Sequence, residues 1–206
     1  MLFELTEEEK LIQAAAARFA KQELEPAAAE LDRTKNRDIL LTNLKKLAEL
    51  GFMGVNIRSE YGGTDSNSVA LSLVLTELGR GCAATAVTTS VTNMVAEAIE
   101  SMGTEAQRKK YLSRVCSGGY PAAGFGLTEP EAGSDASAVC TTAVLRGDHW
   151  ILNGRKIFIT SGAYAGVFII WAVVDKDAPR GEGIGAFLVE PEFAGFTVGK
   201  DEEKMG

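Results

Sequence analysis

The sequence predicts an α+β fold in which an N-terminal bundle of α-helices precedes an antiparallel β-barrel or sandwich-like domain. Up to about residue 117, apolar residues recur at the three-to-four-residue period of a helix. After Gly118–Gly119 the pattern alternates and becomes rich in β-branched and aromatic residues, as in strands. Because helices come first and strands follow, without alternation, we expect two segregated domains at 1–119 and 120–206.

The N-terminal half contains clear start and stop signals for helices. Thr6 followed by Glu9 predicts a capping box, as does Thr104 followed by Gln107. Pro26 should end or kink the first helix, with an Ala-rich restart behind it. Further helices are expected at 38–50, 69–78, 87–102 and 104–116. The 69–78 helix is apolar almost all round, which favours burial between other helices. The 87–102 helix has apolar residues at Val87, Val91, Met94, Val95, Ala98, Ile99 and Met102.

The C-terminal part is predicted to consist of short strands with turn signals between them. The candidate strands are Tyr120–Leu127, Cys140–Leu145, Trp150–Leu152, Lys156–Thr160, Val167–Val174, Gly185–Glu190 and Phe196–Val198. Two matches to GxGxx(G/A), beginning at Gly79 and Gly181, are rejected as dinucleotide-binding motifs. That motif requires a strand before the glycines and a helix after them.

Composition excludes several function classes. The net charge is −7 and no run of Lys or Arg could follow a phosphate backbone, so no nucleic-acid partner is expected. The longest apolar run, 167–174, is too short for membrane insertion. Three cysteines (Cys82, Cys116, Cys140) and a single histidine give no zinc-ligand spacing, so no metal site is expected. The thiols are expected to be reduced. The start MLFELTEEEK lacks a targeting pattern, which favours a prokaryotic cytoplasm, with the mitochondrial matrix as the alternative.

The stretch LTEPEAGSD contains the residues of greatest chemical interest. Thr128, Gly133 and Ser134 could hold an anionic or carbonyl-rich ligand, because glycine allows close approach and short hydroxyls donate without bulk. A second segment, FITSG, offers the aromatic face of Phe158 followed by the hydroxyl of Thr160. Two such segments at strand ends could clamp a flat heteroaromatic ring. The alternative is that these turn side chains satisfy only their own backbone.

Two longer strings resemble the flavin-binding segments of the acyl-CoA dehydrogenase family. They are GFGLTEPEAGSDASAV and WILNGRKIFITSGAYA, and the helical strings AELGFMGVNIRSEYGG and GTEAQRKKYL resemble the same family. The resemblance implies FAD-dependent α,β-dehydrogenation of an acyl-CoA, in which a carboxylate removes the α-proton and the β-hydrogen leaves as hydride to flavin N5. It also implies an electron-transfer flavoprotein or similar acceptor as partner, and a homo-oligomer, namely a tetramer.

The resemblance also implies roles for individual residues. Thr128 and the backbone near Leu127 would hydrogen-bond the pyrimidine side of the flavin, Phe158 would pack on the ring, and Thr160 would sit near N5. Ser134 would reach the FAD pyrophosphate or the CoA arm of the substrate, and the 88–95 stretch would border the acyl tail. The implied FAD-binding residues are Phe125, Leu127, Thr128, Gly133, Ser134, Phe158, Ile159 and Thr160.

The chain departs from the family pattern at its end. It stops at DEEKMG, and the family's usual catalytic Glu would lie beyond Gly206, so the catalytic residue is unknown. Glu129 and Glu131 are expected to be solvated turn carboxylates, and Asp135 a turn or cap residue. We expect part of a longer enzyme; the alternatives are completion by another chain or a non-catalytic unit that binds flavin or acyl-CoA. An acyl-CoA oxidase, a flavin monooxygenase relative or an elimination enzyme on the same fold also stays open.

Overall fold

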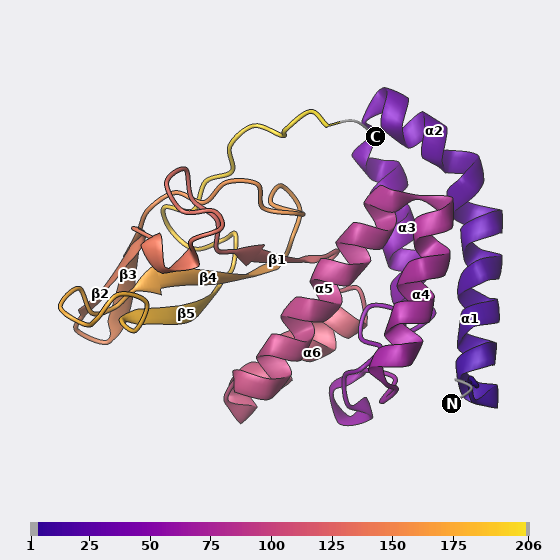
Figure 1. Ribbon diagram of the computed structural model, residues 1–206, viewed down its shortest axis with the longest axis horizontal. Helices are drawn as coiled ribbons and strands as arrows, with labels where there is room; N and C mark the ends of the chain where they lie inside the picture. The colour runs from indigo at the N-terminus through magenta and orange to yellow at the C-terminus, as the bar shows by residue number, and fades with distance from the viewer. Residues whose placement is uncertain (1–3, 205–206) are drawn as a thin grey trace. The chain divides into compact units, whose positions relative to one another are not determined.

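The computed structural model describes residues 4–204 of the chain, which form two compact units (Figure 1). The first unit extends to Ala123, and the second comprises Gly124–Glu202. Each unit is described by itself below. The expectations made for the start of MLFELTEEEK and for the last two residues of DEEKMG lie outside the described residues. The α+β fold with helices first is confirmed.

The first unit is built from α-helices. They are α1 (Glu7–Phe19), α2 (Glu25–Thr34), α3 (Arg37–Glu49), α4 (Ser68–Gly81), α5 (Ala83–Met102) and α6 (Glu105–Cys116). α4 packs against both α1 and α5 (Figure 1). Both predicted capping boxes form: the Thr6 hydroxyl accepts from the Glu9 amide, and the Thr104 hydroxyl from the Gln107 amide. Among residues 4–204, no helix is long and apolar enough to cross a bilayer.

The predicted interruption near Pro26 is confirmed and takes the form of a π-helical segment. Ala20–Leu24 continues α1 with π-helical hydrogen bonding, and α2 restarts at Glu25 with Pro26 in its first turn. The Glu25 amide donates to the Ala20 carbonyl, five residues earlier, and Pro26 next to it has no N–H to donate. The chain therefore passes Pro26 without unwinding, and Leu24 is fully buried at the junction.

α4 lies between other helices as predicted, because it packs against α1 and α5, but one of its faces stays open. Ala70, Val74 and Leu78 are fully buried against the neighbouring helices. The opposite face lines an open surface depression formed by Ser68, Leu71, Ser72, Leu75 and Thr76. The serines and Thr76 at three-to-four-residue spacing mark this face as the solvated one.

The buried face of α5 contains polar as well as apolar residues, unlike the apolar stripe in the sequence. Val87, Met94 and Met102 are exposed, although Val95 and Ile99 are buried. The core face instead contains the buried residues Thr85, Thr88, Thr89, Thr92 and Asn93. Thr89 and Thr92 donate to the carbonyls one turn earlier, at 2.9 and 2.8 Å. Burial of Thr89 and Thr92 is tolerated because their hydroxyls bond within the helix, whereas the Thr85 hydroxyl has no partner in the described part of the chain.

Asn93 joins α5 to the loop that follows α3. Its Oδ1 accepts from the Val55 amide at 2.9 Å, and its Nδ2 donates to the Phe52 carbonyl at 2.9 Å. An apolar residue at this position would leave two buried backbone groups unpaired. The asparagine therefore determines how this loop packs on the helix.

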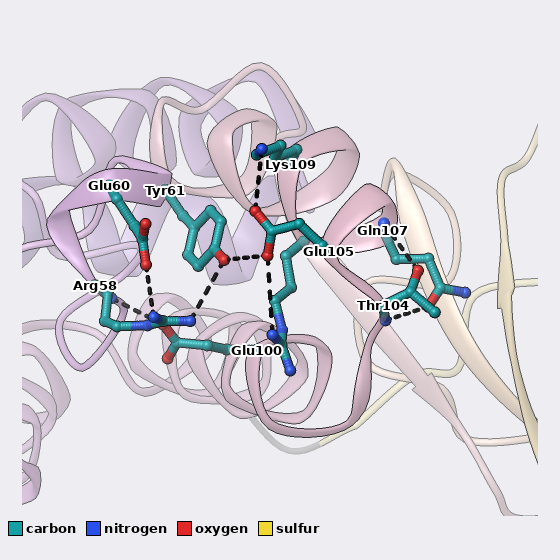
Figure 2. Close-up of polar contacts among 9 residues, drawn as sticks. Arg58, Glu60, Tyr61, Glu100, Thr104, Glu105, Gln107 and Lys109 are labelled. Carbon is teal, nitrogen blue, oxygen red and sulfur yellow. Dashed lines mark hydrogen bonds and ion pairs between the residues drawn. The ribbon is translucent and has the colours of Figure 1, made fainter.

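A polar cluster connects the end of the same loop to α5 and α6 (Figure 2). The Tyr61 hydroxyl donates to Glu105 at 2.7 Å, and the Arg58 guanidinium lies over the Tyr61 ring and contacts Glu100 at 3.0 Å. Hydrogen bonding to Tyr61 and Lys109 lowers the pKa of Glu105. The cluster holds the NIRSEYGG stretch against α5 and α6.

The second unit contains a mixed sheet. Its strands are β1 (Ala123–Gly126), β2 (Thr142–Arg146), β3 (His149–Asn153), β4 (Val167–Val173) and β5 (Ile184–Val189). The order is β1-β4-β2-β3, and β5 also pairs with β4. The pairs β2–β3 and β4–β5 are antiparallel as predicted, whereas β2 meets β4 in parallel where Thr142 lies opposite Val173. Gly124 and Gly126 make room on β1 for the side chains of Phe168 and Ile170.

Three strand predictions are corrected. β1 is shorter than 120–127, because the Tyr120 amide closes the end of α6 on the Arg114 carbonyl and Pro121 has no N–H to donate. The 156–160 segment is not a strand, since Phe158 has a left-handed φ of 56° that breaks the pleat. The 196–198 segment forms no strand either; the Phe196 amide closes a turn on the Phe193 carbonyl.

Candidate functional site

The LTEPEAGSD stretch forms a tight turn directly after β1. Glu129 and Ala132 exchange both backbone hydrogen bonds, at 2.9 and 3.1 Å, so that Pro130 and Glu131 occupy the tip. The space beside Gly133 is open, because no atom lies within 4 Å of the position that a Cβ would occupy. Asp135 caps the short helical turn 136–138 by accepting from the Ser137 amide, and it forms an ion pair with Arg180.

The FITSG segment has an unusual backbone. Phe158 and Ser161 both adopt left-handed φ values, 56° and 66°. This conformation costs a non-glycine residue about 1–3 kcal/mol, and such residues cluster at ligand-binding and active sites. The carbonyl of Ser161 accepts from the amides of Tyr164 and Ala165, which closes the following turn. Phe158 is 73% exposed.

The two predicted segments are side by side. The Ile157 amide donates to the Thr128 carbonyl at 2.9 Å, and the Lys156 ammonium donates to the Leu127 carbonyl at 3.1 Å. Both carbonyls thus already accept one hydrogen bond from within the protein. The turn and the residues leading into FITSG thus lie together as expected, although the second segment is not a strand.

An ion pair that the sequence did not predict connects these segments. Lys156 Nζ lies 2.6 Å from Glu129 Oε1, and their side chains are only 9% and 3% exposed. The Glu129 carboxylate also accepts from the amides of Cys140 and Thr141, at 2.6 and 3.0 Å. Burial alone would raise the pKa of Glu129, but the hydrogen bonds from Lys156, Thr141 and Cys140 outweigh it and lower the pKa to about 2.

The expectation that Glu129 is a solvated turn carboxylate is therefore wrong, whereas Glu131 is exposed as expected. A buried carboxylate needs a partner, and the partner is a lysine 27 residues further on. The two motif strings each contain one of these charges. Once the strings were expected to touch, a Glu–Lys pair between them could have been predicted.

The predicted site residues differ in how they are placed. Leu127 and Thr128 are in direct backbone contact with the 156–157 segment, and Phe158, Ile159 and Thr160 follow from it. Gly133 and Ser134 lie at the exposed end of the turn. Phe125, on β1, packs edge-on against Trp171 of β4, with ring centroids 6.1 Å apart.

The arrangement suits a flat, polar-edged ring. Among the described residues, the hydroxyls of Thr128, Ser134 and Thr160 form no hydrogen bond and are available to a ligand. Ser161, which the sequence analysis did not select, is 6% exposed and its hydroxyl is without a partner in the described part of the chain. An unpaired buried hydroxyl costs about 1–3 kcal/mol. An exposed aromatic face next to free donors can both stack on a ring and bond its edge.

Both parts of the chain match the same protein family. Residues 6–119 match the model "Acyl-CoA dehydrogenase, N-terminal domain", and residues 124–206 match "Acyl-CoA dehydrogenase, middle domain". The chain is 41% identical over its full length to the short-chain specific acyl-CoA dehydrogenase of Clostridium acetobutylicum, of which it covers 54%. It is 40% identical to the acryloyl-CoA reductase (NADH) of Anaerotignum propionicum, covering 52% of that protein.

Solved structures agree with these matches. Butyryl-CoA dehydrogenase from Megasphaera elsdenii has a TM-score of 0.91 at 36% identity, covering 100% of this chain and 54% of the other. A structure described as an electron transferring flavoprotein of Acidaminococcus fermentans has a TM-score of 0.93 at 41% identity, with 100% and 53% covered. The chain thus spans about half the length of the relatives it matches.

Proposed function

The chain belongs to the acyl-CoA dehydrogenase family, and from this premise we propose that it holds FAD for the α,β-dehydrogenation of an acyl-CoA thioester. The observation that carries the proposal is the contact between the two flavin-type segments, with free hydroxyls and an exposed Phe158 beside it. When bound, FAD would supply the hydride acceptor. Electrons would then pass to an electron-transfer flavoprotein or a similar acceptor.

The residues of this chain would bind and orient the cofactor. Thr128 would donate to the pyrimidine edge of the flavin, where negative charge grows on reduction, and donors aimed at developing charge lower the barrier. Phe158 would cover the ring with its exposed face, and Thr160 would lie near N5. Ser134 would hold the pyrophosphate or the CoA arm. Phe125, Leu127, Gly133 and Ile159 complete the proposed cofactor-binding set.

The base that removes the α-proton is not assigned to this chain. Glu129 is unsuited to that role, because its pKa is lowered to about 2 and both of its oxygens accept hydrogen bonds within the protein. A general base works best with a pKa near the operating pH. We propose that a further segment or chain supplies the base, and that assembly is a homo-oligomer, a tetramer as in the family resemblance.

The direction of the reaction is open to a second candidate. The acryloyl-CoA reductase among the relatives is named for the reverse process, reduction of a double bond next to a thioester. We propose dehydrogenation as the main activity, and the acceptor or donor of electrons would decide the direction.

Names of relatives include short-chain and butyryl-CoA enzymes, so butyryl-CoA is the first substrate to test. The proposed compartment is a prokaryotic cytoplasm.

Binding of FAD tests the proposal on the chain as it stands. The purified 206-residue chain should carry a flavin spectrum or quench added FAD. Thr128→Val should weaken retention about 10-fold, since one hydrogen bond to a charged or charge-accepting group contributes about 1.5 kcal/mol. Thr142→Val, on β2 outside the site, is the matched control. A wild-type chain that binds no FAD, or equal affinity in Thr128→Val, would contradict the proposal.

A further inference from the structure

The FITSG segment has a strained backbone, which contacts with neighbouring residues must stabilise. Two of four consecutive residues, Phe158 and Ser161, have left-handed backbones. Such conformations persist only where the surroundings over-determine them. The Phe158 side chain does not provide this restraint, because it is mostly exposed. The restraint must come from the residues immediately before and after.

Anchors occur directly before the first strained residue. Ile157 donates its amide to Thr128, and Lys156 donates to both the Leu127 carbonyl and Glu129. The Glu129 carboxylate continues the connection to the amides of Cys140 and Thr141 at the start of β2. One carboxylate therefore joins the turn after β1, the FITSG segment and β2.

We propose that the Glu129–Lys156 ion pair is a positioning pair that sets the cofactor-binding turn and the FITSG segment in register before any cofactor binds. This inference rests on the proposed FAD site and deepens it. Neither residue needs to touch the ring, since Glu129 accepts from three protein donors and Lys156 donates to two protein acceptors. Their effect is on the placement of Thr128, Phe158 and Thr160.

The energetics favour a positioning role over a simple gain in stability. A buried ion pair often contributes little net stability, whereas removing one partner leaves an uncompensated charge and costs about 3–5 kcal/mol. The loss should be local, because the pair connects two segments outside the regular strands. Misplacement by about 1 Å at a reacting centre can cost on the order of 100-fold in function.

Amide hydrogen exchange and FAD titration of the full 206-residue chain test this inference. The variants are Glu129→Gln and Lys156→Met, and the matched controls are Glu131→Gln, the exposed carboxylate of the same turn, and Arg155→Met, the exposed neighbour of Lys156. The Ile157 amide should exchange at least about 10-fold faster in the two variants without FAD. FAD affinity should fall about 10-fold to 100-fold in them.

Amides of β4 report whether the unit as a whole stays folded. If a single variant loses β4 protection, the double variant Glu129→Gln/Lys156→Met, which leaves no unpaired charge, takes its place. Faster exchange at Ile157 with intact β4 and weaker FAD binding, both absent from the controls, supports the positioning pair. Unchanged exchange at Ile157, or unchanged FAD affinity despite faster exchange, overturns it. A wild-type chain that binds no FAD overturns the proposed function instead, while the exchange result still decides whether the pair holds the segment.

Discussion

At the scale of single residues, burial decides which of several similar side chains matter. Glu129 and Glu131 stand two positions apart in one turn, yet one is paired inside the protein and the other is exposed. Cys116 and Cys140 differ in the same way. Residue type alone does not show which member of each pair is buried; the surrounding fold determines it.

Acid should weaken the fold through Glu129. Its pKa is lowered from 4.5 to about 2 in the folded state, so its contribution is fully present above pH 4.5 and is lost as pH falls toward 2. A shift of this size corresponds to about 3 kcal/mol. The difference in unfolding free energy between wild type and Glu129→Gln, measured by urea unfolding, should be largest above pH 4.5 and narrow toward pH 2. A difference that stays constant with pH would contradict the assignment.

Thiol labelling should distinguish the cysteines. Burial, and secondarily the charge of Glu100, raises the pKa of Cys116 to about 11, so its reactive thiolate is scarce at neutral pH. Cys140 is exposed and should take up a thiol reagent first in the folded chain. Cys140→Ser should abolish this fast phase and change unfolding free energy by less than about 0.5 kcal/mol. Mass mapping of the labelled peptide checks the site, and a fast phase that survives Cys140→Ser would refute it.

At the scale of elements, small residues set how closely helices approach. Gly79 and Gly81 both lie near the end of α4, which agrees with rejecting them as a dinucleotide motif. A Cβ on Gly81 would stand 2.9 Å from Leu24 Cβ and 3.0 Å from the Ala20 carbonyl oxygen. A Cβ on Gly79 would meet only Ala86, at 3.9 Å. The π-helical segment therefore packs on α4 only because residue 81 lacks a side chain.

Alanine at these two glycines should have opposite effects. Gly81→Ala should destabilise the helical unit by about 1–3 kcal/mol, because a backbone carbonyl must shift to admit the methyl group. Gly79→Ala should be neutral or stabilise by up to about 1 kcal/mol, since alanine is the better helix former. Thermal and urea unfolding of the two variants measure the contrast. Equal effects would mean that the close contact of α4 with Ala20 and Leu24 is not formed.

At the scale of the whole molecule, apolar surface is exposed in both units. On the hairpin of β2 and β3, the cross-strand pair Val144 and Ile151 is 41% and 55% exposed. Exposed apolar surface on a sheet favours association with other chains. The net charge of −7 acts in the opposite direction by mutual repulsion.

Replacing the exposed pair should improve solubility at little cost. Val144→Thr/Ile151→Thr keeps β-branched residues in the strands, so the unfolding free energy should change by no more than about 1 kcal/mol. The concentration at which light scattering rises should increase. Ala143→Thr is the control, because Ala143 is buried at 2% exposure and the added hydroxyl should destabilise the sheet without improving solubility. Unchanged scattering in the double variant would exclude this pair as the associating surface.

Local chemistry was enough to predict much of the fold. Capping boxes, the effect of Pro26 and the change of period near Gly118 depend on neighbours in sequence, and all three are confirmed. The meeting of the two motif strings was also expected. The strand predicted at 156–160 was wrong: its composition suits a strand, but the backbone of Phe158 is left-handed, and Lys156 and Ile157 bond the turn after β1.

The order of the units, the approximate positions of the helices and the family could be predicted from the sequence, because short-range periods and motif strings encode them. Three features became visible in the fold alone: the buried face of α5, the pairing of Glu129 with Lys156, and the buried Ser161 hydroxyl, which has no partner in the described residues. These features depend on groups that meet across the fold, where burial changes the free energy of a charge or hydroxyl by several kcal/mol. No local pattern contains that information.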